Sequence, residues 1–280
     1  MSSDEIAQCA QLAMLLELSS GPKPGNVDRC HDFSDIGFDH FLASAVSAYP
    51  VLKKAASGKN RFGELLFRAV KSWSYWKLPG NTHFGSLVLI IPLAIAAGRP
   101  GSLKDNLISV LKESTVDDAL HFYRAFELAN ARVKDVEKYS LKDHSSLEKL
   151  RQRSITLFDL MSLSREHDLI AGEWCSGYKR CFQFADLIAQ NVFAFGPNEG
   201  VARTYLQALA EVPDSLVRTK FGSEKAKEVC FKAKMALDDL SMASAEKLDL
   251  ELLEEDINPG STADLIAAAL FIALLKGLRF

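Results

Sequence analysis

Apolar residues recur along most of the chain at the three- and four-residue spacing of an amphipathic α-helix, and the alternation typical of β-strands is scarce. The first such face runs from Ile6 to Leu18, and its helix must end at the GPKPG stretch of residues 21–25, because proline cannot continue a helix. Further helices are predicted at 38–57, 61–76, 82–97, 101–112, 116–131, 154–163, 167–195, 198–211, 222–248 and 261–277.

This pattern predicts an all-α fold, a single-domain multi-helix bundle of about ten or more helices that spans residues 1–280. No linker of low complexity interrupts the helices. The most charged stretch, Asp135 to Arg153, alternates in sign and is predicted to be an exposed connection.

Charge and hydropathy exclude two classes of protein. Lys and Arg number 33 against 36 Asp and Glu, a net charge of −3, and no basic cluster stands out that could bind a nucleic-acid backbone. The two most apolar runs, Leu87 to Ala97 and Leu265 to Leu275, are about half the length of a membrane span. We therefore expect neither nucleic acid nor membrane as a partner.

The cysteines and the N-terminal residues indicate the compartment. The five cysteines include no C-x-x-C pair, which argues against a zinc ribbon or a disulfide framework. The residues after Met1 are acidic rather than basic, unlike a secretory signal. We expect a cytoplasmic protein.

Three glycine-containing polar turns stand out from the apolar helices, and the first covers residues 21–29. Gly25 and Asn26 can turn the backbone so that successive N–H groups point at an anion. Lys23 and Arg29 can add positive charge, and Arg29 can hold phosphate oxygens with two hydrogen bonds. The structural alternative is a rigid surface turn whose charges are solvated.

The second turn, residues 79–85, precedes a strongly apolar helix. Asn81 or Thr82 is a natural N-cap, and the amino end of the helix offers N–H groups to phosphate. His83 can donate a hydrogen bond to that anion or act as an acid. The structural alternative is a histidine that only caps or packs at the helix start.

The third turn, residues 258–264, also precedes an apolar helix and contains Asn258 and Gly260. Ser261 and Asp264 fit a capping box, which is a complete structural explanation for Asp264. If the three turns converge at one end of the bundle, their helix N-termini form a polyphosphate pocket.

Carboxylates near these turns are candidate magnesium ligands, because Mg²⁺ takes carboxylate oxygens together with substrate phosphates. Asp28 and Asp32 lie in or next to the first turn, and Asp168 begins a further predicted helix that includes Glu173. Acidic residues at helix starts are also common caps. The remaining histidines, including His31, show no ligand spacing.

Four segments resemble the triphosphoribosyl-dephospho-CoA synthase family. They are LELSSGPKPGNVDR (16–29), FDHFLASA (38–45), GNTH (80–83) and NPGSTADLIAAALF (258–271). The segments reach from one end of the chain to the other, and their combination in this order is specific. The chain resembles the archaeal-type members more than the bacterial enzymes.

The resemblance implies an all-α transferase in which the 2′-hydroxyl of 3′-dephospho-CoA displaces adenine from C1′ of the ATP ribose, giving 2′-(5″-triphosphoribosyl)-3′-dephospho-CoA. Breaking this N-glycosidic bond passes through an oxocarbenium-like state that a carboxylate stabilises, while a second carboxylate can deprotonate the hydroxyl. The implied partners are ATP and dephospho-CoA, and the implied cofactor is Mg²⁺.

From these residues and the resemblance we expect Lys23, Arg29 and His83 to contact phosphates. The expected catalytic residues are Asp28, Asp168 and Asp264, of which Asp28 and Asp168 bind magnesium or the ribose. The other residues expected to bind nucleotide are those of the turns, namely Gly25, Asn26, Asn81, Thr82, Asn258, Gly260 and Ser261.

Two positions depart from the bacterial pattern and leave alternatives open. Phe84 stands where those members have a basic residue, and Asp168-Leu169-Ile170 stands in place of D-T-N. One alternative is a related nucleotide-using enzyme of coenzyme biosynthesis with another small-molecule acceptor. A second is a helical binding or scaffold protein with a degenerate site. A homo-oligomer is also left open.

Overall fold

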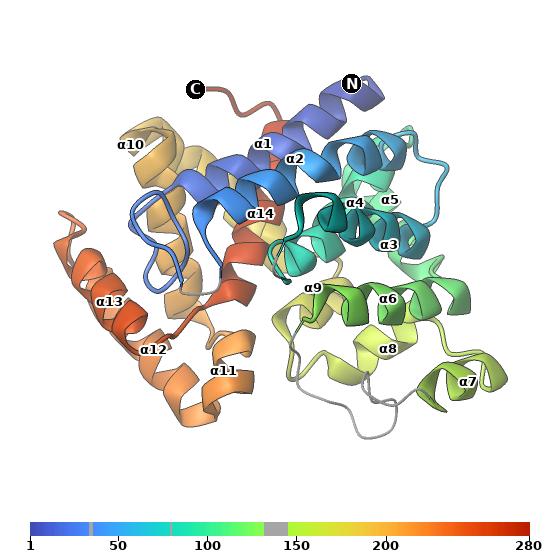
Figure 1. Cartoon of the computed structure of the whole chain (residues 1–280). Coiled ribbons are helices and arrows are strands. Elements are labelled where there is room, and N and C mark those ends of the chain that lie inside the picture. Colours follow the sequence, from blue (N-terminus) through green and yellow to red (C-terminus); the bar gives the residue numbers. More distant parts are fainter. Residues whose placement is uncertain (34–35, 79, 132–144) are drawn as a thin grey trace. The chain divides into compact units, whose positions relative to one another are not determined.

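The computed structural model describes residues 1–33, 36–78, 80–131 and 145–280. These residues form fourteen α-helices and one short 3-10 helix without any β-strand, which confirms the all-α prediction (Figure 1). They divide into two compact units, a first of Met1–Gln11 and Ala43–Lys179 and a second of Leu12–Leu42 and Arg180–Phe280. The expectation of a single domain stays a prediction.

Helices of the first unit, wholly or in part, are α1 (Ser3–Ser19), α2 (Phe38–Ala55), α3 (Phe62–Ser72), η1 (Trp73–Trp76), α4 (Phe84–Ala97), α5 (Leu103–Lys112), α6 (Val116–Ala129), α7 (Ser145–Gln152), α8 (Leu157–Ser164) and α9 (Leu169–Ser176). The second unit contains the remainder of α1 and α2 with α10 (Lys179–Glu211), α11 (Ser215–Phe221), α12 (Ser223–Ala236), α13 (Ala243–Glu254) and α14 (Gly260–Leu275).

Helix α4 is the core of the first unit, because every residue from Phe84 to Ala96 is buried. It packs against α3, α5 and α9. Pro92 lies inside this helix and has no N–H, so the carbonyl of Val88 loses its helical donor. Nε1 of Trp174 donates a hydrogen bond to that carbonyl at 3.2 Å. A side chain of α9 therefore satisfies the backbone group that the proline leaves unpaired.

Helix α14 is the core of the second unit, because its residues from Ser261 to Leu274, apart from Asp264, are buried. Asp214 connects its amino end to that of α11. One carboxylate oxygen accepts from the amides of Leu216 and Val217, and the other accepts from the amide and the hydroxyl of Thr262. Burial raises the pKa of Asp214, whereas these hydrogen bonds oppose the increase. The carboxylate thus joins the starts of two helices.

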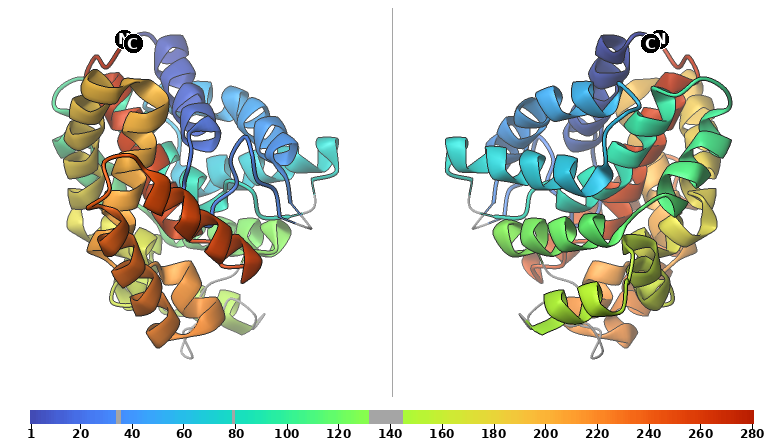
Figure 2. Two further views of the ribbon diagram at one scale, coloured as in Figure 1. Left: turned by 90° about the vertical axis from the view of Figure 1, so that its left-hand side faces the viewer. Right: turned by 90° about the vertical axis from the view of Figure 1, so that its right-hand side faces the viewer.

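Helices α12 and α13 lie side by side (Figure 2). The sequence predicted a single helix at 222–248, but the chain breaks between them. The carboxylate of Asp239 accepts hydrogen bonds from the amides of Ser241 and Ser244, and Met242 has a φ of 65°. These local bonds compete with the helical ladder.

The helix predicted at 167–195 is also two helices. Gly177 ends α9 in the left-handed conformation, with a φ of 67°, and α10 begins at Lys179. Glycine commonly ends a helix in the left-handed conformation, since it has no Cβ that would be strained there. Farther along, Gly196 and Pro197 bend α10 at the boundary that the sequence predicted between 195 and 198.

Two helices lie where none was predicted. Helix α11 follows the cap that Asp214 provides. Helix α7 lies in the charged stretch from Asp135 to Arg153, of which residues 135–144 are outside the described part of the chain. Among the described residues, no helix reaches the combination of length and hydropathy that crossing a membrane requires.

Candidate active site

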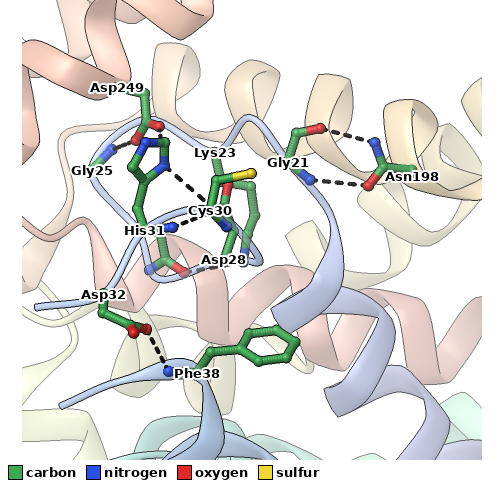
Figure 3. Close-up of polar contacts among 11 residues, drawn as sticks. Gly21, Lys23, Gly25, Asp28, Cys30, His31, Asp32, Phe38, Asn198 and Asp249 are labelled. Carbon is green, nitrogen blue, oxygen red and sulfur yellow. Dashed lines mark hydrogen bonds and ion pairs between the residues drawn. The ribbon is translucent and has the colours of Figure 1, made fainter.

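The candidate site is the loop of residues 20–33 in the second unit, between α1 and α2. Gly21 exchanges two hydrogen bonds with the side chain of Asn198 in α10, of 3.2 and 3.0 Å (Figure 3). The hydroxyl of Tyr205, also from α10, donates to the carbonyl of Pro24 at 3.1 Å. The loop is therefore held along its backbone rather than solvated as a surface turn.

Gly25 is the point where the loop turns most sharply. Its φ of 72° is in the left-handed region, and a Cβ there would lie 2.3 Å from the carbonyl oxygen of Ile257. Its N–H donates to Oδ1 of Asp249 in α13 at 2.8 Å. Only glycine combines this backbone conformation with so close an approach. Its amide points at a carboxylate, however, and not at the anion that the sequence predicted.

Lys23 lies buried beneath this turn. Its ammonium group donates to Oε1 of Glu17 at 2.5 Å and to Oδ1 of Asn26 at 3.1 Å, and it is 5.9 Å from the centre of the Tyr205 ring. The Lys23 side chain has no exposed surface. Burial raises the pKa of Glu17, an effect that the nearby Lys23 ammonium opposes.

This position gives no support to the expectation that Lys23 contacts phosphate, which stays a prediction. A lysine that reaches a ligand must present its charge at an accessible surface, whereas here the charge is neutralised by Glu17 inside the protein. Lys23 therefore fixes the shape of the loop. The pairing could not be seen in the sequence because Glu17 belongs to the preceding helix and has no motif of its own.

Of the three turns expected to converge, the first and the third are in contact. Nδ2 of Asn26 donates to Oδ1 of Asn258 at 3.0 Å. The capping box expected in the third turn is wrong, because α14 begins at Gly260 and Ser261 already lies inside its first turn. The hydroxyl of Ser261 accepts from that of Ser215 at 2.9 Å. Asp264 lies half-buried one turn into α14, so its catalytic role stays a prediction.

Three ionisable side chains converge at the loop, namely Asp28 and His31 of the loop itself and Asp249 of α13 (Figure 3). Nδ1 of His31 is 3.1 Å from Oδ2 of Asp249 and 3.5 Å from Oδ1 of Asp28. Both carboxylates are buried, while the His31 side chain is 31% exposed. One edge of this cluster is thus open to solvent.

Each carboxylate of the cluster is oriented by the backbone of the loop. Oδ1 of Asp28 accepts from the amides of Cys30 and His31, at 2.8 and 3.2 Å. Oδ1 of Asp249 accepts from Gly25, as described above. Burial raises the pKa of Asp249 to about 6, with opposing contributions from the Gly25 amide and His31 and a further increase from the Asp28 charge.

Exposed polar residues surround the cluster along the loop. Arg29 is exposed, as a phosphate contact requires, and Cys30 is exposed beside it. Asp32 is exposed, and its carboxylate accepts from the amide of Phe38 at 2.6 Å. Asp32 therefore acts as a cap for the start of α2 and is not part of the cluster.

The second predicted turn lies in the first unit. The N-cap of α4 is His83, so the prediction that Asn81 or Thr82 is the N-cap is wrong, although Oδ1 of Asn81 accepts a hydrogen bond from the amide of Phe84 at 3.2 Å. Thr82 is buried, and Nδ1 of His83, also buried, lies 3.1 Å from the hydroxyl of Ser44. Contact of these residues with phosphate stays a prediction.

Asp168 also lies in the first unit, where it is the N-cap of α9. Its carboxylate accepts from the amide of Ala171 at 2.8 Å. The structural alternative for this residue is therefore correct in this structure, whereas its catalytic role stays a prediction. Glu173, in the same helix, is buried.

Binding of magnesium by Asp28 and Asp168 stays a prediction. Among the described residues, the carboxylates and histidines close enough to share an ion are Asp28, His31 and Asp249. His31 was not predicted to be a metal ligand because its distance in sequence from the other histidines does not match a ligand spacing. The spacing Asp28-x-x-His31 was the available signal, while Asp249 has no local signal because it is 224 residues from the loop amide that it accepts.

Comparison with known proteins identifies the family to which these features belong. The model of the ATP:dephospho-CoA triphosphoribosyl transferase family matches residues 3–279. The chain belongs to this family. Membership confirms the resemblance that the four sequence segments carry, and it makes the chain a transferase that uses ATP and dephospho-CoA.

Individual relatives agree with the family. Two strains of Vibrio cholerae serotype O1 have a protein named "Probable 2-(5''-triphosphoribosyl)-3'-dephosphocoenzyme-A synthase", each 25% identical over 95% of this chain and 87% of their own. A crystal structure from Archaeoglobus fulgidus, provisionally named a triphosphoribosyl-dephospho-CoA synthase, matches with a TM-score of 0.73 and 32% identity. The match covers 86% of this chain and all of that one.

Proposed function

We propose that the loop of residues 20–33, together with Asp249, forms part of the reaction centre at which the triphosphoribosyl group of ATP is transferred to dephospho-CoA. In this reaction the bond between adenine and C1′ of the ribose breaks, and a bond forms between C1′ and the 2′-oxygen of dephospho-CoA. The hydroxyl loses its proton, and the departing adenine gains one. The observation that carries the proposal is the family match over nearly the whole chain.

The charge of the cluster suits this chemistry. Asp28 and Asp249 are two buried carboxylates that share one imidazole, so the group carries an excess of negative charge. Positive charge develops at C1′ as the glycosidic bond breaks, and the ATP triphosphate travels with a divalent cation. Fixed carboxylates stabilise the positive charge at C1′ and also attract the divalent cation. The backbone hydrogen bonds to Asp28 hold its carboxylate in position before substrate arrives.

The cations of the site divide into two roles. Arg29 is exposed at the edge of the loop and is proposed to contact phosphate oxygens. Lys23 is enclosed with Glu17 and is proposed to position the loop. Mg²⁺ is the proposed cofactor, brought with ATP. A phosphate contact from His83, a cytoplasmic location and a homo-oligomeric state stay predictions.

The structure explains why Phe84 can stand where the bacterial members have a basic residue. This side chain is buried, and its ring packs against Phe122 and Phe126 with centroids 5.7 and 5.8 Å away. The position that is basic in the bacterial members is therefore a core position here. The loop of the second unit, rather than this position, is where we propose that phosphate recognition is concentrated.

Release of adenine tests the proposed function. The purified chain is incubated with Mg-ATP and dephospho-CoA, and adenine and the triphosphoribosyl product are measured by chromatography and mass spectrometry. We expect adenine release that depends on dephospho-CoA and that falls by about 10²-fold or more in Asp28→Asn, whose side chain can still accept the amides of Cys30 and His31. The matched control is Asp32→Asn, an exposed carboxylate of the same loop.

Two other results would contradict the proposal in different ways. If ATP stabilises the protein thermally but adenine is not released, another acceptor is in use. ATP at 100 times its dissociation constant stabilises a protein by about 2.7 kcal/mol, which a melting experiment detects. If ATP gives no stabilisation at all, the chain is a binding or scaffold protein.

A further inference from the structure

Two buried polar atoms face each other in the cluster without a hydrogen bond. They are Nδ1 of His31 and Oδ2 of Asp249, which are 3.1 Å apart. Within the described part of the chain, neither atom has a hydrogen-bond partner. The Asp249 side chain is 99% buried, so water does not compensate the carboxylate oxygen from the surface. A buried oxygen whose contact with His31 is an ion-pair distance and not a hydrogen bond is costly and calls for an explanation.

The distances within the cluster match those between ligands of one metal ion. Two ligands in adjacent octahedral positions, each about 2.1 Å from an ion, lie about 3.0 Å apart. Nδ1 of His31 lies 3.1 Å from the Asp249 oxygen and 3.5 Å from an oxygen of Asp28. One atom from each of the three side chains lies within 4.8 Å of the others.

The two carboxylates of the cluster are also held by groups outside it, as metal ligands usually are. The amides of Cys30 and Gly25 each bind one carboxylate, so neither side chain has to be ordered by the ion itself. A Cβ on Gly21 would lie 2.3 Å from Oδ2 of Asp28, which shows how closely the loop encloses that carboxylate.

We propose that Asp28, His31 and Asp249 bind one divalent metal ion. Two carboxylates and a neutral imidazole carry two negative charges, which one such ion balances. Carboxylates suit Mg²⁺ and Mn²⁺, whereas an imidazole ligand favours the first-row transition ions, so this mixed set fits Mn²⁺ better than Mg²⁺. The role of the ion rests on the proposed function, because the triphosphate of ATP is the anion that such an ion holds.

Direct binding of Mn²⁺ to the full chain, without nucleotide, tests the site. Free Mn²⁺ has an electron paramagnetic resonance signal that is lost on binding, so a titration gives the dissociation constant and the number of sites. We expect one site per chain that weakens by at least about 10-fold in Asp249→Asn and in His31→Gln. In Asp249→Asn the side-chain oxygen can still accept a hydrogen bond from the Gly25 amide. This variant therefore removes the charge at position 249 while keeping its contact with the loop.

Matched controls come from the same segment of the chain. Asp32→Asn removes an exposed carboxylate of the loop, and His40→Gln removes a histidine whose Nδ1 accepts from the amide of Gly37. Both variants should bind Mn²⁺ as the unaltered chain does. Far-ultraviolet circular dichroism and thermal melting establish that each variant is folded.

A spectroscopic signature keeps the test decisive even where affinities change little. Pulsed electron paramagnetic resonance of bound Mn²⁺ detects the nitrogen of a coordinating imidazole. This nitrogen coupling should be present in the unaltered chain and in His40→Gln, and absent in His31→Gln. Bound Mn²⁺ without any nitrogen coupling, or with coupling that survives His31→Gln, would overturn the site.

The results separate this inference from the proposed function. If adenine is released but Mn²⁺ binding is unchanged in Asp249→Asn and His31→Gln, the function stands and the metal site is wrong. If Mn²⁺ binds with the expected nitrogen coupling but adenine is never released, the metal site stands and the function is wrong. Absence of Mn²⁺ binding to the unaltered, folded chain also overturns the site.

Discussion

Two groups of buried charges lie close together along the loop of the second unit, and their compositions differ. The first pairs one carboxylate, Glu17, with one ammonium, Lys23, and both side chains are enclosed. The second places the carboxylates Asp28 and Asp249 around the single imidazole of His31, with one edge open to solvent. The first group is neutral by itself, and the second has an excess of negative charge.

The difference indicates what each group does. A matched pair needs no further partner, so Glu17 and Lys23 give the loop its shape. An unmatched group of buried carboxylates is unfavourable until a cation or a developing positive charge approaches. The loop of a triphosphoribosyl transferase offers both kinds of group within a few residues, and the following experiments perturb them one at a time.

The largest effect on stability is expected for breaking the matched pair. Lys23→Met leaves Glu17 buried without its counter-charge and should lower the free energy of unfolding by about 3–5 kcal/mol. Urea denaturation followed by circular dichroism measures this change. The double variant Glu17→Leu/Lys23→Met removes both charges and should recover most of the loss. A single variant as stable as the unaltered chain would mean that the pair has no structural role.

A smaller effect is expected for crowding the unmatched group. Gly21→Ala adds a methyl group whose carbon would lie 2.3 Å from the present position of Oδ2 of Asp28, which is too close for two unbonded atoms. The carboxylate must move, so we expect a loss of about 1–3 kcal/mol in stability together with weaker Mn²⁺ binding. The control is Gly172→Ala in α9, where the nearest atom to the new methyl group is 3.4 Å away. Equal Mn²⁺ affinity in Gly21→Ala and the unaltered chain would contradict the expected displacement.

The smallest effect concerns the pH dependence of the matched pair. Burial raises the pKa of Glu17 above its ordinary value of 4.5, so between the two values the folded protein binds more protons than the unfolded chain. The free energy of unfolding therefore decreases as pH rises through this range. Urea denaturation at several pH values from 4.5 upward should show a flatter dependence in Glu17→Leu/Lys23→Met. An identical slope in the two proteins would show that Glu17 does not titrate in this way.

Features that depend on neighbouring residues were predictable from the sequence. The end of α1 before the proline turn, the bend near Gly196 and the apolar helices α4 and α14 all follow from local periodicity, proline and glycine. The break after Ala236 was missed because the competing carboxylate of Asp239 lies within a continuous apolar pattern. Hydrogen bonds of a single side chain can end a helix without changing its periodicity.

Residue roles were less predictable than element positions. The motif from Lys23 to Arg29 marked the right loop, but a lysine in a motif reads the same whether it faces solvent or a buried carboxylate. Its partner Glu17 lies on the preceding helix, among the apolar residues of a buried face. Burial of this pair depends on how the loop folds back on α1, which no local pattern specifies.

The sequence by itself determined most of the helices, the three polar turns and the family, because each is encoded by residues that are close together or by motifs in a fixed order. Only the tertiary structure decided that Lys23 is neutralised by Glu17 and that Asp249 joins Asp28 and His31. Asp249 is brought to the loop through the amide of Gly25, 224 residues away. The charge of a residue follows from its own side chain, whereas the neutralisation of that charge depends on which other charges the folded chain encloses with it.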